Sequence, residues 1–262
     1  MPPIPNAPRM ELWLDGIQRF LAPPQEKLEA TGSWDSSYVV LNSSSTRVAS
    51  EPRPAGMLRV RRTPAADGAS ARLDVELVAR GQWFGSFRMA AAIECATDAL
   101  ATPRSWKLST ASLDAQDRPV ALTAVEESGR IEDGTVVRTG AKERRTKAPG
   151  AVTSNWSLFD AVQRLPREKT PPLDFALLED LDLLKANQRL TWRGAATVQV
   201  GGKPLELFGY QQLGEGILPH HYWLDAAGRL LIVYGGLRCF VFNARAATLP
   251  GAGQPAGRRA GK

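Results

Sequence analysis

Near its C-terminal end the chain reads His220-His221-Tyr222-Trp223-Leu224-Asp225-Ala226-Ala227-Gly228-Arg229-Leu230-Leu231-Ile232-Val233-Tyr234. Aromatic and β-branched residues flank Asp225–Gly228, which fits a type I turn closed by glycine, so two strands are predicted. Upstream, Val200–Lys203 holds two glycines that tolerate positive φ and predicts a hairpin. We therefore expect an antiparallel meander across 188–242, with strands at 189–193, 196–200, 205–211, 222–224, 229–234 and 238–242.

Between residues 33 and 113, apolar side chains recur at every second position. They include Leu58, Val60, Leu73, Val75, Leu77, Trp106 and Leu108. Charged and small polar residues lie between them, which predicts strands with one face in a core and one face in water. The segment 84–96 is more continuously apolar and predicts a strand covered on both faces. An Asp-Gly pair at 133–134, between β-branched residues, predicts another hairpin.

Three short helices are expected, at 10–21, 157–165 and 174–185, from apolar residues at helical spacing. Ser157 with Asp160 resembles a capping box at the start of the second helix. The residues expected to be buried under the sheet are Trp13, Ile17, Leu158, Leu178 and Leu181. The expected fold class is α+β and mostly antiparallel: a curved sheet or incomplete barrel with short helices on its concave face.

The domain organisation follows from changes in composition along the chain. Residues 1–9 are rich in proline and 246–262 in alanine, glycine, proline and arginine, so both ends are expected to be disordered. Residues 10–245 are expected to form a single β-rich domain, with a loop break at 140–152 around a basic run. No signal peptide and no apolar run of roughly 20 residues is visible, so the chain as given is expected to be soluble, with its compartment open.

Composition limits the classes of function. Of 262 residues, 43% are hydrophobic, which predicts a folded globular domain, and the formal net charge is +6. The basic run 142–147 permits contact with nucleic acid or anionic lipid, but no aromatic residue is interleaved with it, so no specific nucleic-acid partner is expected. Cys95 and Cys239 lie in apolar runs and are expected to be buried, their pairing left open. No metal site, cofactor or oligomeric state is predicted.

Imidazole chemistry could come only from His220 and His221, the two histidines of the chain. Neighbouring residues on a strand point to opposite faces, so at most one histidine is expected to face a given cavity. A general base could form with a nearby Glu215 or Asp225, or with Tyr210. This alternative would make the protein a small hydrolase or lyase, although the standard catalytic motifs are absent.

Large aromatic residues gather on the predicted sheet and could line a ligand cavity. The candidate ligand-binding residues are Trp106, Trp192, Tyr210, Tyr222 and Trp223. The same rings could equally fill the core between sheet and helices. Aromatic crowding without catalytic motifs favours a non-catalytic binding protein with an apolar cavity for a lipid or another hydrophobic molecule.

The hairpin with Trp223, Asp225, Gly228, Arg229 and Leu230 resembles a strand–turn–strand of the LolA/LolB-like half-barrel envelope proteins of bacteria. The order of elements over residues 30–244 resembles that family too. The resemblance implies an incomplete barrel wrapped around helices, with an apolar cavity that accepts lipid acyl chains. It also implies an envelope or periplasmic location and permits a peripheral contact with a membrane.

Overall fold

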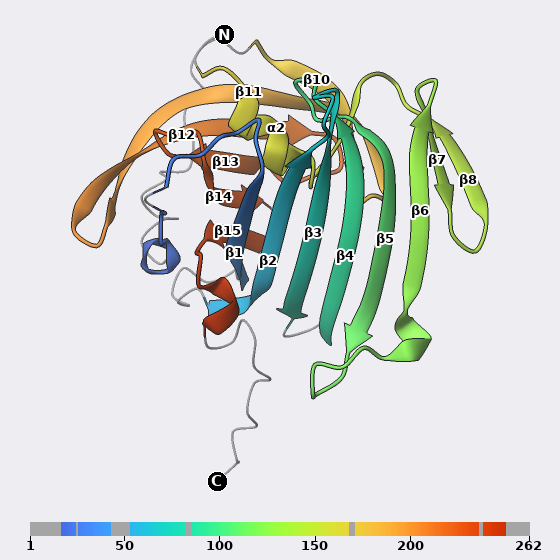
Figure 1. Ribbon diagram of the computed structural model, residues 1–262, viewed down its shortest axis with the longest axis horizontal. Helices are drawn as coiled ribbons and strands as arrows, with labels where there is room; N and C mark the ends of the chain where they lie inside the picture. Colours follow the sequence, from blue (N-terminus) through green and yellow to red (C-terminus); the bar gives the residue numbers. More distant parts are fainter. Residues whose placement is uncertain are drawn as a thin grey trace.

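The computed structural model describes residues 17–24, 26–42, 53–81, 85–167, 171–235 and 238–249. These residues form one 15-stranded sheet that curves around a single α-helix, α2 (Leu158–Arg164) (Figure 1). The expected fold class is confirmed: the sheet is mostly antiparallel and barrel-like without closing.

The strands fall into two halves of the chain. The first half contains β1 (Trp34–Asn42), β2 (Arg53–Pro64), β3 (Ser70–Gly81), β4 (Gly85–Ala96), β5 (Pro103–Leu113), β6 (Val125–Glu132), β7 (Thr135–Thr139) and β8 (Glu143–Lys147). The second half contains β9 (Val152–Ser154), β10 (Leu173–Glu179), β11 (Leu183–Val200), β12 (Lys203–Gly214), β13 (His220–Leu224), β14 (Leu230–Gly235) and β15 (Arg238–Phe242).

The two halves join in the middle of the sheet. The order runs from β8 down to β1, then from β15 down to β9, so β1 pairs with β15. Each described pair of neighbours is antiparallel except β9 with β10, which is parallel. The turns predicted at Asp133-Gly134, Gly201-Gly202 and Asp225–Gly228 all connect paired strands.

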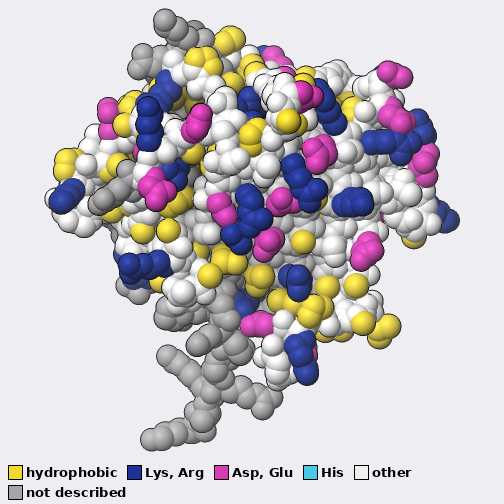
Figure 2. All heavy atoms as spheres, in the orientation of Figure 1, with side chains coloured by type: hydrophobic (Ala, Val, Ile, Leu, Met, Phe, Trp, Pro, Cys, Tyr) yellow, Lys and Arg dark blue, Asp and Glu magenta, His cyan; other side chains and the backbone are white. Residues whose placement is uncertain are grey.

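Period-two alternation in β2 to β5 separates a core face from a charged face. Every second residue of β3, for example, is buried. On the opposite face, Arg59 Nη2 lies 2.6 Å from Asp35 Oδ2 and Arg72 Nη2 lies 2.8 Å from Asp74 Oδ1. Figure 2 shows cationic and anionic side chains interspersed on this side of the molecule. The strand β4, predicted to be covered on both faces, alternates buried with half-buried positions, so its second face is covered only in part.

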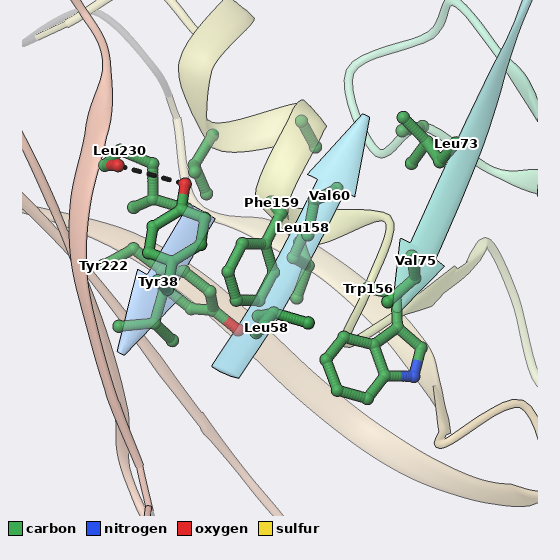
Figure 3. Close-up of a cluster of buried hydrophobic side chains, with 14 of the residues drawn as sticks. Tyr38, Leu58, Val60, Leu73, Val75, Trp156, Leu158, Phe159, Tyr222 and Leu230 are labelled. Atoms are coloured by element: carbon green, nitrogen blue, oxygen red, sulfur yellow. Dashed lines mark hydrogen bonds between the residues drawn. The ribbon is translucent and has the colours of Figure 1, made fainter. Parts of the chain in front are cut away.

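The core lies between the concave face of the sheet and α2 (Figure 3). The ring of Phe159 meets Tyr38 edge-on at 5.4 Å and Phe240 at 5.8 Å. The hydroxyl of Tyr38 donates to the carbonyl oxygen of Leu230 at 3.1 Å. Trp156 lies beside Phe159, with ring centroids 6.2 Å apart. Aromatic side chains from the helix segment therefore fill the curve of the sheet.

The helix predicted at 157–165 is confirmed, but its cap differs from the prediction. The Oγ of Ser154 accepts a hydrogen bond from the backbone N–H of Ser157 at 2.9 Å, while Ser157 itself makes no side-chain cap. Asp160 does not act in a capping box, because its carboxylate pairs with two arginines.

The helix predicted at 174–185 was wrong. This segment is β10, a turn, and the start of β11. Asp180 and Leu181 have φ of 50° and 62°, a left-handed conformation that ends any helix. Leu178 and Leu181 are nevertheless fully buried, as predicted.

Three other boundaries differ from the prediction. Residues 143–147 form β8 and 152–154 form β9 of the same sheet, so no break separates two halves at 140–152. Ordered structure extends past 245 through η3 (Ala246–Thr248). At the N-terminal end, η1 (Gln18–Phe20) is a single 3₁₀ turn and Ile17 is buried. The rest of the predicted helix, with Trp13, the segment 1–9 and the tail from 250 lie outside the described residues.

Candidate functional site

Strand register shows which of the five candidate aromatic residues share a face. Trp192 pairs with Tyr210, Tyr210 with Tyr222, and that row continues to Phe240, which packs on α2. Trp106 lies on the same face. The residues paired with it in turn on β4, β3 and β2 lead across the sheet to the core-facing side of β1. Trp223 is adjacent to Tyr222 on β13 and therefore points to the opposite face. The structure brings four of the five candidates to the concave side.

Most of these rings are buried by packing against the protein itself. Trp106 covers Gly129, where an added Cβ would lie 2.2 Å from the indole ring. Trp223 covers Gly209 in the same way, at 2.3 Å. Glycine is required at both positions because the ring occupies the place of a side chain. These two tryptophans are thus part of the core rather than free to meet a ligand.

Tyr210 and Tyr222 are also buried, and a polar network holds Tyr222. Its hydroxyl donates to Gln212 Oε1 at 3.0 Å, and Gln212 Nε2 donates to Gln188 Oε1 at 3.3 Å. Gln188 in turn donates to the carbonyl oxygens of Ala186 and Glu215. Burial raises the pKa of Tyr222 well above its ordinary value, so the phenol stays neutral.

Trp192 differs from the other described tryptophans because its ring is only half-buried. It stacks on Phe208, with ring centroids 6.3 Å apart and an interplanar angle of 17°, and meets Tyr210 edge-on at 5.1 Å. The guanidinium of Arg167 lies 4.4 Å above the Phe208 ring. We call Trp192, Phe208 and Tyr210 the aromatic row. Its two half-buried members, Trp192 and Phe208, present apolar rings on the β11–β12 arm, beside the Arg167 guanidinium.

The two histidines do not form a catalytic pair. They lie on opposite faces of β13, as predicted from their spacing. His220 Nδ1 is 2.8 Å from the Leu218 carbonyl oxygen and its ring covers Gly235, while His221 Nε2 is 3.5 Å from Gln211 Nε2. Burial lowers the pKa of both imidazoles below the ordinary value.

The predicted acidic and phenolic partners of the histidines point elsewhere. Glu215 Oε1 accepts a hydrogen bond from Asn187 Nδ2 at 2.9 Å, and Asp225 Oδ1 accepts from the backbone N–H of Arg229 at 2.9 Å. The hydroxyl of Tyr210 reaches the Pro166 carbonyl oxygen at 3.5 Å. The geometry of the described residues therefore gives no histidine–carboxylate couple for general base catalysis.

Two hollows formed by the described residues carry ionic side chains in their walls. The larger is an open groove of about 810 Å³ over β2 to β6, lined by ionic side chains such as Arg72, Glu76, Lys107 and Glu126. The smaller, about 330 Å³, lies at the turn between β7 and β8. Neither is an apolar cavity of the expected kind, because the concave side is filled by α2 and its aromatic neighbours.

A buried charge cluster was not anticipated from the sequence. The carboxylate of Asp160 on α2 pairs with both Arg62 and Arg164. The Nε atom of each arginine lies 2.9 Å from one carboxylate oxygen. The sequence indicated a buried position for Arg62, because this residue continues the alternate, core-facing positions of Leu58 and Val60 on β2. An arginine at such a position predicts a buried acidic partner, although not its identity.

Cys95 and Cys239 are both buried and unbridged. Among the described residues, no group of three or more His, Cys, Asp and Glu side chains is placed to hold a metal ion. No helix in the described part of the chain has the length and apolar character needed to cross a membrane.

Comparisons with known proteins bear on the fold alone. The sequence matches no family model, and no curated protein matches it. Among solved structures, the chain is similar to a β-barrel-like protein of a domain of unknown function, DUF1849, from Brucella abortus. The TM-score is 0.50 and the identity 11%, over 86% of this chain and 96% of the other. This likeness supports the curved, barrel-like sheet and assigns no activity.

Proposed function

We propose that this protein is a non-catalytic binding protein for a lipid or another hydrophobic molecule, held against the aromatic row. The observation that carries the proposal is the half-buried stacked pair Trp192–Phe208. The other described tryptophans, Trp34, Trp106, Trp156 and Trp223, are buried. The uncovered parts of these half-buried rings lose contact with water when a ligand covers them, which favours binding.

The surroundings of the aromatic row suit an amphiphile. Arg167 holds its guanidinium over Phe208 and also donates to the Ala226 carbonyl oxygen at 2.6 Å, so the cation is fixed in place. An acyl chain along the rings with an anionic head group near this cation would satisfy both features.

The resemblance of the Trp223–Leu230 hairpin to LolA/LolB-like half-barrels supports the same class of ligand. That family is expected to bind acyl chains inside the half-barrel. In this protein α2 occupies the inside, so we place the ligand on the β11–β12 arm instead. An envelope location is part of this proposal.

Native mass spectrometry with oleate as probe tests the proposal. The wild type and Trp192→Phe, which keeps a ring, should take up oleate, whereas Trp192→Ala with Phe208→Ala should not. Leu218→Ser serves as the control, because Leu218 is 58% exposed and lies outside the aromatic row. Ligand-free wild type at every oleate concentration, or uptake unchanged in the double alanine variant, would refute the assignment.

A second observation favours contact with a membrane surface. At η2 (Ala121–Thr123) the tip between β5 and β6 exposes Val120 at 36%, Leu122 at 100% and Val125 at 49%. Three apolar side chains on a narrow tip cover far less than the roughly 800 Å² per partner of a stable protein interface. They match shallow insertion among lipid head groups.

Vesicle flotation tests this contact. Leu122→Glu should reduce the fraction of protein that floats with phosphatidylcholine vesicles, while Leu218→Glu, at another exposed leucine, should not. Equal flotation of the wild type and Leu122→Glu would exclude the tip as the contact.

A further inference from the structure

The strand β8 forms one outer edge of the sheet, and no strand among the described residues pairs with its far side. All five of its residues are exposed. At the other end of the sheet, β9 has three residues and all are buried. The edge at β8 is therefore the one open to another chain.

Backbone hydrogen bonding shows which groups on β8 are free. Ala148 donates to the Gly134 carbonyl oxygen at 2.9 Å, and bonded pairs alternate along an antiparallel ladder. From the register, Arg144 and Thr146 turn their backbone groups toward β7. Glu143, Arg145 and Lys147 turn theirs outward, and together they offer three donors and three acceptors to an added strand.

The charges beside this edge are unevenly compensated. Arg145 pairs with Glu132 and Glu143 on one face. On the other face Lys142 and Arg144 form no ion pair with any described residue. They are two positions apart, so their side chains lie on one side of the strand, roughly 7 Å apart along it.

These two cations line the smaller hollow. Its walls are Glu127, Arg138, Gly140, Ala141, Lys142 and Arg144. Arg138 forms an ion pair with Asp182, which lies in the turn after β10. The one acidic side chain in the wall, Glu127, lies against Gly140, where an added Cβ would be 3.0 Å from its carboxylate. Lys142 and Arg144 thus remain available to a ligand.

We propose that β8 accepts an extended acidic segment of a partner protein by strand addition. The partner's backbone would pair with Glu143, Arg145 and Lys147, and carboxylates at alternate positions would meet Lys142 and Arg144 in the hollow. A second copy of this chain fits less well, because antiparallel pairing of β8 with β8 about its centre would place the two Arg145 side chains opposite each other. Charged side chains at an edge disfavour pairing with apolar strands and with strands of like charge. The same charges favour pairing with an acidic strand.

Fluorescence anisotropy measures binding of a labelled peptide in which Thr and Glu alternate. The full chain should bind this peptide and not its Thr/Gln counterpart. Lys142→Glu with Arg144→Glu should weaken binding by about tenfold or more. Lys203→Glu with Arg88→Glu, the same change of charge at two exposed cations elsewhere, should leave the affinity unchanged.

A proline substitution separates strand addition from simple charge attraction. Arg145→Pro removes an outward N–H that β7 does not use, so the edge can fold but cannot pair fully with a new strand. Arg145→Thr is the matched control for the lost charge. Binding should fall in Arg145→Pro and persist in Arg145→Thr, with both variants melting near the wild-type temperature. Amide exchange at 143, 145 and 147 should slow when the peptide is bound.

Four results would overturn the proposal. These are absence of binding, equal binding by the proline and threonine variants, unchanged exchange at the three amides, or stronger competition by single-stranded DNA or phosphatidylglycerol vesicles than by the acidic peptide. The outcome is independent of the oleate experiment, because the aromatic row and β8 share no residue.

Discussion

Arg62 Nε lies 2.9 Å from Asp160 Oδ1, and the two side chains are only 2% and 1% exposed. The contact joins β2 to α2. Arg164, one turn after Asp160, reaches the other carboxylate oxygen, and Arg62 also donates to the carbonyl oxygens of Thr31 and Gly32. The cluster therefore fixes the helix inside the sheet at a single position.

Asp160→Asn should destabilise the protein strongly. The substitution leaves two arginines without their anion, one of them fully buried, and breaking such a pair costs about 3–5 kcal/mol. The free energy of unfolding from urea titration measures the loss. The control is Asp174→Asn, which breaks the exposed pair with Arg189 and should cost about 0–1 kcal/mol. Similar losses in the two variants would contradict the role of the buried cluster.

Gly209→Ala should destabilise the domain through Trp223. The new Cβ would overlap the indole ring, and overpacking of this kind costs about 1–3 kcal/mol. Gly150→Ala is the control, because nothing lies within 4 Å of its added Cβ. The double variant Gly209→Ala with Trp223→Leu should lose less stability than the sum of the single variants. Strict additivity would show that the two positions do not touch.

Stability should fall as pH drops from about 7 toward 5, because of the histidines. Burial lowers the pKa of His220 and His221 in the folded state, so the unfolded chain binds protons more readily. Their contribution is fully present above the unfolded pKa near 6.5 and is lost as pH falls below that value toward the lower folded pKa. Replacing both by Asn should flatten the dependence of the unfolding free energy on pH in this window. An unchanged slope would refute the attribution.

Both thiols should be unreactive in the folded protein. Burial raises the pKa of Cys95 to about 12 and also raises that of Cys239 well above its ordinary value, so almost no thiolate is present at pH 8. Reaction with DTNB should be slow in buffer and complete in denaturant, with both cysteines labelled. Rapid labelling of the native protein would show that one of these sites opens.

The sequence by itself determined the alternating strands between residues 33 and 113 and the tight turns of the hairpins. Alternation such as Leu73, Val75 and Leu77 has one physical reading, a strand with one face in the core, and paired glycines or Asp-Gly fix tight turns. The burial of Leu178 and Leu181 also followed from their apolar character. These features depend only on near neighbours along the chain.

Tertiary structure decided the rest. Leucines at 177, 178 and 181 fit either a helix or a strand covered on both faces, and only pairing with β9 and β11 selects the strand. Two further features depend on contacts between distant segments: the face that carries Trp223, and the source of the carboxylate beside Arg62. Local sequence does not encode them, because many registers satisfy the same alternation and only the complete packing of sheet and helix distinguishes one from another.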